Sequence, residues 1–72
     1  MNQLEILGHR LQILRKEKKQ RQKDMGDFLD VTLRNYQRME KGEINVQALT
    51  LCTLADYFGV STDYLLGRSE ER

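Results

Sequence analysis

Residues 33–41 carry the side chains whose types and spacing best suit the binding of a ligand. On a helical wheel these residues divide into two arcs of about 100° each. The polar arc holds Gln37, Lys41, Arg34 and Arg38. Arg34 and Arg38 are four residues apart and therefore repel each other as neighbours, which makes sense if an anion or a row of hydrogen-bond acceptors lies in front of them. The planar fork of arginine suits guanine O6 and N7 in a DNA major groove, where a good pairing discriminates by about 1–3 kcal/mol.

The same segment also fits a plain solvated helix face, so the composition and the neighbouring elements have to decide. The net charge of +1 is unevenly divided along the chain. Residues 1–41 contain ten Lys and Arg against six Asp and Glu, whereas residues 42–72 contain two against five. Residues 10–23 contain seven basic side chains and one acid, Glu17. This division fits either a solvated face or a face turned toward a polyanion.

A chain of 72 residues is long enough for one domain, which we expect to have its core at about 4–67 and a polar tail at 68–72. Cys52 and His9 are the single residues of their types, which leaves no internal disulfide and no set of metal ligands. We expect Cys52 to be a small core residue and His9 to be solvated. With no nucleophile–base pair or glycine-rich phosphate loop, we expect neither an enzyme nor a cofactor. The lone cysteine favours the cytoplasm, and no apolar run reaches the ~20 residues of a membrane span.

Apolar spacing and capping residues predict five short helices at about 4–18, 22–29, 32–41, 47–58 and 62–66. Thr32 and Ser61 are the predicted N-caps of the third and fifth helices. In the second helix, Met25, Phe28 and Leu29 form the expected core face. In the fourth, the apolar positions are Ala48, Leu51, Cys52, Leu54, Ala55 and Phe58.

A helix of about eight residues, a short turn at Asp30 and Val31, and a capped helix with a polar outer face form a helix-turn-helix. The stretches QKDMGDFLDVTLRNYQRMEKG and LCTLADYFGVSTDYLLG resemble the Cro/repressor-type (XRE-like) helix-turn-helix regulators of bacteria and phages, over about Leu4 to Gly67. The resemblance implies an all-α fold, a compact five-helix lambda-repressor-like DNA-binding domain with the helix-turn-helix at the second and third helices.

By this resemblance the third helix is the recognition helix, which enters the major groove of double-stranded DNA. The residues implied to contact base edges are Leu33, Arg34, Asn35, Gln37 and Arg38. Leu33, where a polar side chain is frequent in the family, suits a thymine methyl group. The residues implied to contact phosphates are Arg21, Gln22, Lys23, Thr32 and Lys41, and such contacts position the protein without reading sequence.

The resemblance also accounts for Glu40, an acid on the inward arc of the third helix. In the family an acid at this position pairs with an arginine of the first helix, and Arg15 is the matching residue. Independently, the wheel places Arg15 on the flank of the apolar stripe of the first helix. We therefore expect a semi-buried, structural ion pair between Arg15 and Glu40.

The chain departs from the family pattern at three places. Asp30 stands where a glycine commonly makes the turn, and Gly26 replaces the usual alanine inside the second helix. Residues 19–21 replace the usual glycine, apolar residue and cap, which allows the first helix to continue past Lys18.

Several apolar side chains exceed what one small core needs, and they suggest a homodimer surface at Ile6, Ile13, Tyr57, Tyr64 and Leu65. In the alternative, Ile6 and Ile13 pack on the C-terminal segment of the same chain. Tyr36 is expected in the core with its hydroxyl at the surface.

The function we expect is that of a dimeric repressor that occludes a promoter at a palindromic operator, with half-sites about 34 Å apart. No small-molecule effector domain fits in the chain, so we expect control by concentration, dimerisation or another protein. The alternative is an antitoxin that binds a toxin and autoregulates its operon, which the short tail after Gly67 disfavours.

Overall fold

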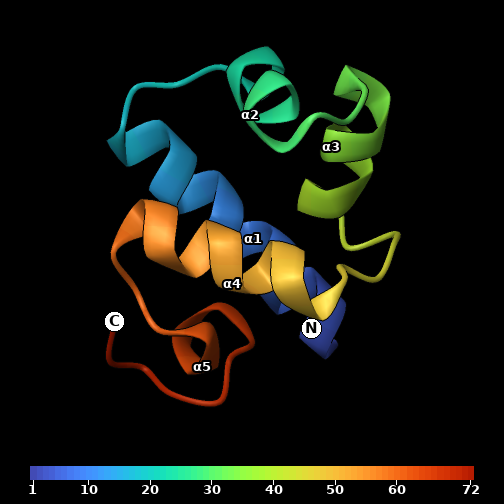
Figure 1. Ribbon diagram of the computed structural model, residues 1–72. Helices are drawn as coiled ribbons and strands as arrows, with labels where there is room; N and C mark the ends of the chain where they lie inside the picture. Colours follow the sequence, from blue (N-terminus) through green and yellow to red (C-terminus); the bar gives the residue numbers. More distant parts are fainter.

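The computed structural model describes residues 1–72 as five helices without a strand (Figure 1). The helices are α1 (Gln3–Glu17), α2 (Gln22–Leu29), α3 (Leu33–Glu40), α4 (Ala48–Phe58) and α5 (Thr62–Leu65). The predicted all-α class is confirmed, and each helix begins and ends within one residue of its predicted bounds. No helix has the length and apolar content that crossing a membrane would need.

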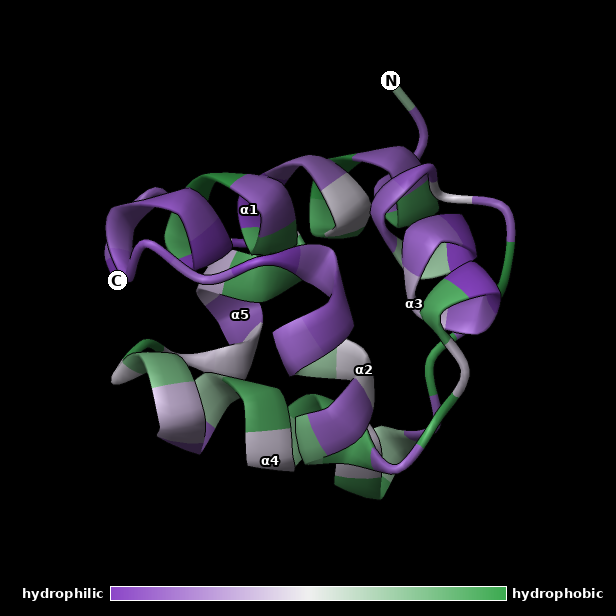
Figure 2. Cartoon of the chain, turned by 90° about the horizontal axis from the view of Figure 1, so that it is seen from above, coloured by the Kyte–Doolittle hydropathy of each residue, from purple (hydrophilic) through white to green (hydrophobic).

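The two helices of the helix-turn-helix lie together at one end of the molecule, and α5 lies at the other end (Figure 1). Seen from above, α1 and α4 form opposite sides of the molecule, and the N-terminal part of α1 lies near α3 (Figure 2). The helices enclose a core of ten buried side chains. These are Leu7, Leu11, Leu14, Met25, Tyr36, Met39, Leu54, Ala55, Tyr64 and Leu65.

The turns on either side of α2 use two non-glycine residues in the left-handed region, Lys19 and Asp30, each with φ of 57°. At Lys19 the first helix stops, and the backbone N–H of Gln20 donates to the Arg15 carbonyl at 3.1 Å. The sequence would have allowed the first helix to continue past Lys18. The helix does not do so, because the chain turns at Lys19. At Asp30 the chain reverses toward α3, so aspartate supplies the turn that glycine commonly makes in the family.

Two expectations about the core are wrong. Phe28 is 46% exposed and stacks on Tyr57, with ring centroids 4.4 Å apart, instead of joining the core. Cys52 is exposed on the side of α4 turned away from Leu54. In both short helices the apolar arc is wider than the surface that neighbouring helices cover, so its outer members remain in solvent.

A third expectation, that the hydroxyl of Tyr36 lies at the surface, is also wrong. The whole residue is buried where α3 packs on α1 and α2, and its hydroxyl lies beside Glu40 and Arg15. Burial together with the neighbouring Glu40 carboxylate raises the pKa of this phenol well above its ordinary value. Tyr36 therefore remains neutral and acts as core.

Gly8 sets the distance between α1 and α3. A methyl group on Gly8 would lie 2.6 Å from the Met39 carbonyl oxygen, which belongs to the backbone of α3. Since neither backbone can move without shifting a helix, only glycine permits this crossing.

Replacing Gly8 by alanine is expected to destabilise the domain although alanine favours helices. The gain in helix propensity is about 1 kcal/mol, whereas overpacking against fixed backbone costs about 1–3 kcal/mol. The measurement is urea-induced unfolding followed by circular dichroism. Lys16→Ala, at an exposed position of the same helix, serves as control and should change stability by less than about 0.5 kcal/mol. A Gly8→Ala variant more stable than the native chain would contradict the prediction, because helix propensity would then outweigh any contact with the backbone of α3.

Candidate nucleic-acid interface

The outer side of α3 presents most of its polar side chains to solvent. Its N-cap is Thr32, whose hydroxyl accepts the backbone N–H of Asn35 at 3.0 Å, as predicted. Arg34 and Arg38 are exposed, and Leu33 is 44% exposed at the start of the helix. Asn35 and Gln37 are half-buried, and Lys41 is exposed at the C-terminal end.

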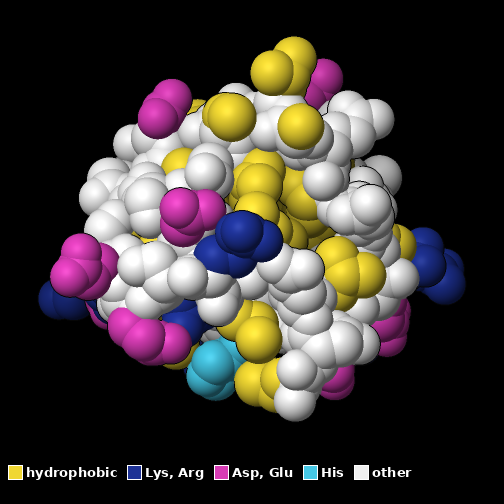
Figure 3. All heavy atoms as spheres, turned by 90° about the horizontal axis from the view of Figure 1, so that it is seen from below, with side chains coloured by type: hydrophobic (Ala, Val, Ile, Leu, Met, Phe, Trp, Pro, Cys, Tyr) yellow, Lys and Arg dark blue, Asp and Glu magenta, His cyan; other side chains and the backbone are white.

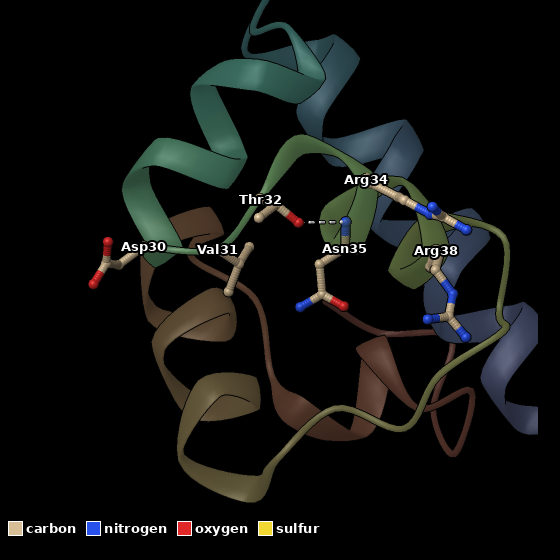
Figure 4. Close-up of a pocket in the computed structure, with 6 residues that line it drawn as sticks. All are labelled: Asp30, Val31, Thr32, Arg34, Asn35 and Arg38. Carbon is tan, nitrogen blue, oxygen red and sulfur yellow. Dashed lines mark hydrogen bonds between the residues drawn. The ribbon is translucent and has the colours of Figure 1, made fainter.

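A shallow polar hollow of about 670 Å³ lies in front of the N-terminal half of α3 (Figure 4). It is lined by Asp30, Val31, Thr32, Arg34, Asn35 and Arg38. In the close-up, Asn35 and Val31 point into the opening, while Asp30 points away from it. The hollow thus brings together three of the residues predicted to contact bases. Val31 was not predicted to line it, because the sequence assigned this residue only to the turn.

A second hollow of about 310 Å³ lies where α1, α2 and α3 meet. Its lining is entirely polar: Gln12, Gln22, Gln37, Glu40 and Lys41. The amide of Gln22 donates to Glu40 Oε1 at 3.0 Å, and the Gln22 oxygen accepts from the amide of Gln37 at 3.2 Å. Gln22 is therefore hydrogen-bonded to α3. It connects the residues predicted to contact phosphates with those predicted to contact bases. Nothing in the sequence singled out Gln12.

Arg15 and Glu40 form the bidentate ion pair expected from the sequence. Arg15 Nε donates to Glu40 Oε2 at 2.7 Å and Arg15 Nη2 donates to Oε1 at 3.2 Å. The two side chains are 10% and 4% exposed. The third guanidinium nitrogen, Nη1, donates to the Gln20 carbonyl at 2.9 Å. The pair thus ties α3 to α1 and to the loop before α2.

The charges of this pair are stabilised in the interior. Burial disfavours the Glu40 carboxylate, but the hydrogen bonds from Arg15 and Gln22 outweigh that effect and hold the pKa of Glu40 below its ordinary value of 4.5. The same hydrogen bond raises the pKa of Arg15. Glu40 is therefore ionised at neutral pH and turned away from the exposed side of α3.

The exposed basic side chains make only weak intramolecular contacts. Arg21 pairs with Asp24 at 2.9 Å and Lys23 with Asp27 at 3.0 Å, both on α2. Arg38 Nε lies 3.5 Å from an oxygen of Glu43, an acid in the loop after α3 that the sequence had not assigned to this surface. Exposed pairs of this kind contribute about 0–1 kcal/mol each, so these cations are free to turn toward a polyanion.

The predicted dimer surface is partly wrong. Tyr64 and Leu65 are buried in the core and cannot meet a partner. The guanidinium of Arg10 lies 4.2 Å from the centre of the Tyr64 ring and also donates to the Ser69 carbonyl, so the chain covers this region itself. Ile6 is half-buried against Gly67, which supports its packing on the chain's own C-terminal segment.

Two comparisons place this geometry among known proteins. The helix-turn-helix family profile matches residues 11–65. A relative from Bacillus subtilis (strain 168), the SPbeta prophage-derived uncharacterized HTH-type transcriptional regulator YonR, is 39% identical over 61 residues. The aligned region is 85% of this chain and 56% of the relative, so the chain spans about half the length of the relative it matches.

Removing the guanidinium of Arg15 is expected to destabilise the domain strongly, because the Glu40 carboxylate would be left buried without its partner. For a pair this well buried, Arg15→Ala should cost about 3–5 kcal/mol of unfolding free energy. The measurement is urea unfolding of the variant beside the native chain.

Arg21→Ala is the matched control, since it removes an arginine from an exposed pair and should change the stability little. If Arg15→Ala were no more costly than Arg21→Ala, the pair would not be what holds α3 in place.

Proposed function

We propose the function from one premise: the chain belongs to the XRE-type helix-turn-helix family of DNA-binding regulators. On this proposal it is a dimeric repressor that inserts α3 into the major groove of an operator and covers a promoter there. It acts in the cytoplasm on double-stranded DNA, without a cofactor.

The observation that carries the proposal is the division of charge on α3. Arg34 and Arg38 extend from the exposed side of the helix without a buried partner, whereas Glu40 is fixed on the inner side by Arg15. Two exposed guanidinium groups one turn apart, of which only Arg38 has a weak surface partner in Glu43, favour a ligand with closely spaced acceptors. A major groove offers such acceptors on guanine, and the half-buried amides of Asn35 and Gln37 add the fork that suits adenine N6 and N7.

The remaining polar residues around α3 are assigned to the sugar–phosphate backbone. Arg21, Gln22 and Lys23 lie at the N-terminal end of α2, where the unpaired N–H groups of the first turn also attract an anion. Thr32 and Lys41 lie at the two ends of α3. Contacts from these flanking positions would fix the depth and direction of α3 in the groove.

The operator is proposed to be a palindrome whose half-sites lie about 34 Å apart, so that two copies related by a two-fold axis each read one half. Selection of bound fragments from a pool of random duplex DNA tests this point. We expect an inverted repeat with that spacing to be enriched. Enrichment of a single unrepeated site would exclude the dimer, and no enrichment at all would exclude sequence-specific binding.

Replacing Arg38 by alanine is expected to weaken binding to the selected duplex much more than binding to unrelated DNA. The loss of one bidentate base contact should cost about 1–3 kcal/mol on the selected sequence only. Fluorescence anisotropy with both duplexes measures the two affinities. An equal loss on both would reduce Arg38 to a phosphate contact.

Replacing Lys23 by alanine should lower the affinity for all sequences by a similar factor. It should also flatten the slope of log affinity against log salt concentration by about one unit, because one phosphate contact no longer releases counterions. Lys16→Ala removes the same charge from α1 and should leave the slope nearly unchanged. A slope unaffected by Lys23→Ala would exclude Lys23 from the interface.

A further inference from the structure

The outward side of α4 is exposed, not covered by another helix, and uncharged up to Asp56 near its C-terminal end. We call this side, formed by Ala48, Leu49, Cys52 and Thr53, the α4 outer face; all four residues are exposed, and Leu49 is 81% exposed. Residues 44–55 contain no charged side chain, although 32% of the chain is charged. Figure 2 shows the contrast, because α4 is coloured mostly green and white while α1 and α3 carry broad hydrophilic stretches.

A hollow of about 280 Å³ lies on another side of α4. Its apolar lining consists of Leu4, Leu7, Val46, Leu51 and Leu66. In the view from below, hydrophobic side chains protrude at the edge of the molecule and also fill a central hollow (Figure 3). Exposed apolar surface on a small domain commonly marks a protein contact.

We propose that the α4 outer face binds the α4 outer face of a second copy of this chain, with the two helices antiparallel about a two-fold axis near Cys52. This inference rests on the proposed function, since it identifies the surface through which the dimer forms. It replaces the surface expected from the sequence, of which Tyr64 and Leu65 are buried.

Charge favours a second copy as the occupant of this face. In a two-fold contact the same face of each copy meets itself, so a face that carries charge of one sign repels itself. The outer side of α3 has this defect through Arg34, Arg38 and Lys41. The α4 outer face has no charge before Asp56 at its C-terminal end, and it can therefore meet its own copy without repulsion at the centre.

The size of the molecule also favours a second copy. The Cα positions extend over 28 × 22 × 21 Å. Two copies centred on half-sites about 34 Å apart therefore leave roughly 6 to 13 Å between their backbones. Helices in contact pack with their axes about 8–10 Å apart. The gap between the backbones of two copies on adjacent half-sites is thus about as wide as the distance between two packed helices, so side chains can fill it.

The side chains of the face suit such a contact. Cys52 lies at the middle of the exposed positions, so antiparallel pairing about this point places Leu49 of each copy at the level of residue 55 of the other, against Cys52, Thr53 and Asp56. One large side chain among small ones lets the two helices approach closely. A single helix face is smaller than the ~800 Å² per partner of a standard stable interface. We therefore expect the two copies to associate weakly in solution and fully when both are bound to DNA.

Cys52 supplies a built-in reporter for the experiment. A disulfide requires Cα atoms closer than about 7 Å, which the proposed axis provides for Cys52 and its copy. The native chain is treated with diamide, which accepts the two hydrogens released when two thiols form a disulfide. The dimer is followed by non-reducing electrophoresis. The matched control is the double variant Cys52→Ser with Asn45→Cys, which carries one exposed thiol outside the α4 outer face.

The native chain is expected to cross-link at least tenfold faster than the control variant. Leu49→Asp should bring the native rate down to the control level, because it places two carboxylates against the facing helix. Leu49 is largely exposed, so circular dichroism should show an unchanged fold. Equal rates for the native chain and the thiol control would overturn the proposal, including the case in which another protein occupies this face.

Anisotropy with the selected duplex separates this proposal from the proposed function. If the native chain binds DNA with an inverted repeat but Cys52 does not cross-link faster than the control, the α4 surface is wrong and the repressor remains. If Cys52 cross-links faster and no duplex is bound, the α4 surface stands and the proposed function fails.

Discussion

The arrangement of this domain depends on the bidentate ion pair between Arg15 and Glu40. Through its three donor nitrogens Arg15 reaches Glu40 on α3 and the Gln20 carbonyl before α2, and Glu40 in turn accepts from Gln22 on α2. One network therefore fixes the relative positions of all three helices around the helix-turn-helix. Both charges are buried, and each offsets part of the desolvation cost of the other. If one is removed, the other remains buried without compensation, which destabilises the fold. Gly8 supports the same arrangement by letting α1 and α3 cross at backbone contact.

The treatment of charge on α3 follows from this anchor. Glu40, which would otherwise weaken a polyanion-binding face, is turned inward and paired with Arg15. Arg34 and Arg38, which would destabilise a core, remain exposed. Their mutual repulsion is small in water and is screened by salt, so the folded chain tolerates it at little cost. The weak pair between Arg38 and Glu43 lowers the exposed charge further without fixing the side chain. The free domain thus holds its arginines exposed and lightly paired.

Sequence reasoning predicted the features that depend on local chemistry. Helix bounds follow from the caps at Thr32 and Ser61 and from apolar spacing, and the fold class follows from their order along the chain. The ion pair was also accessible, since the wheel put Arg15 on a flank and Glu40 on an inward arc. The errors concern Phe28, Cys52, Tyr36 and the expected dimer residues Tyr64 and Leu65, and they have one cause. A wheel shows which arc of a short helix is apolar, but only the packing of distant segments determines which part of that arc is covered. The exposed α4 outer face and the hollows around α3 depend on such packing and could not be predicted.

The exposed faces of α3 and α4 can be understood together on the proposed function. A recognition helix of eight residues offers few base contacts, and each adds only about 1–3 kcal/mol of discrimination. A single copy therefore has limited specificity, and a second copy doubles the contacts. A weak contact between copies is sufficient for this purpose, because neighbouring half-sites hold the two proteins at an effective concentration in the millimolar range. A strong, preformed dimer would need a larger apolar surface than the α4 outer face provides. An uncharged helix face of modest size is thus the kind of partner surface that a domain this small can carry beside its charged recognition helix.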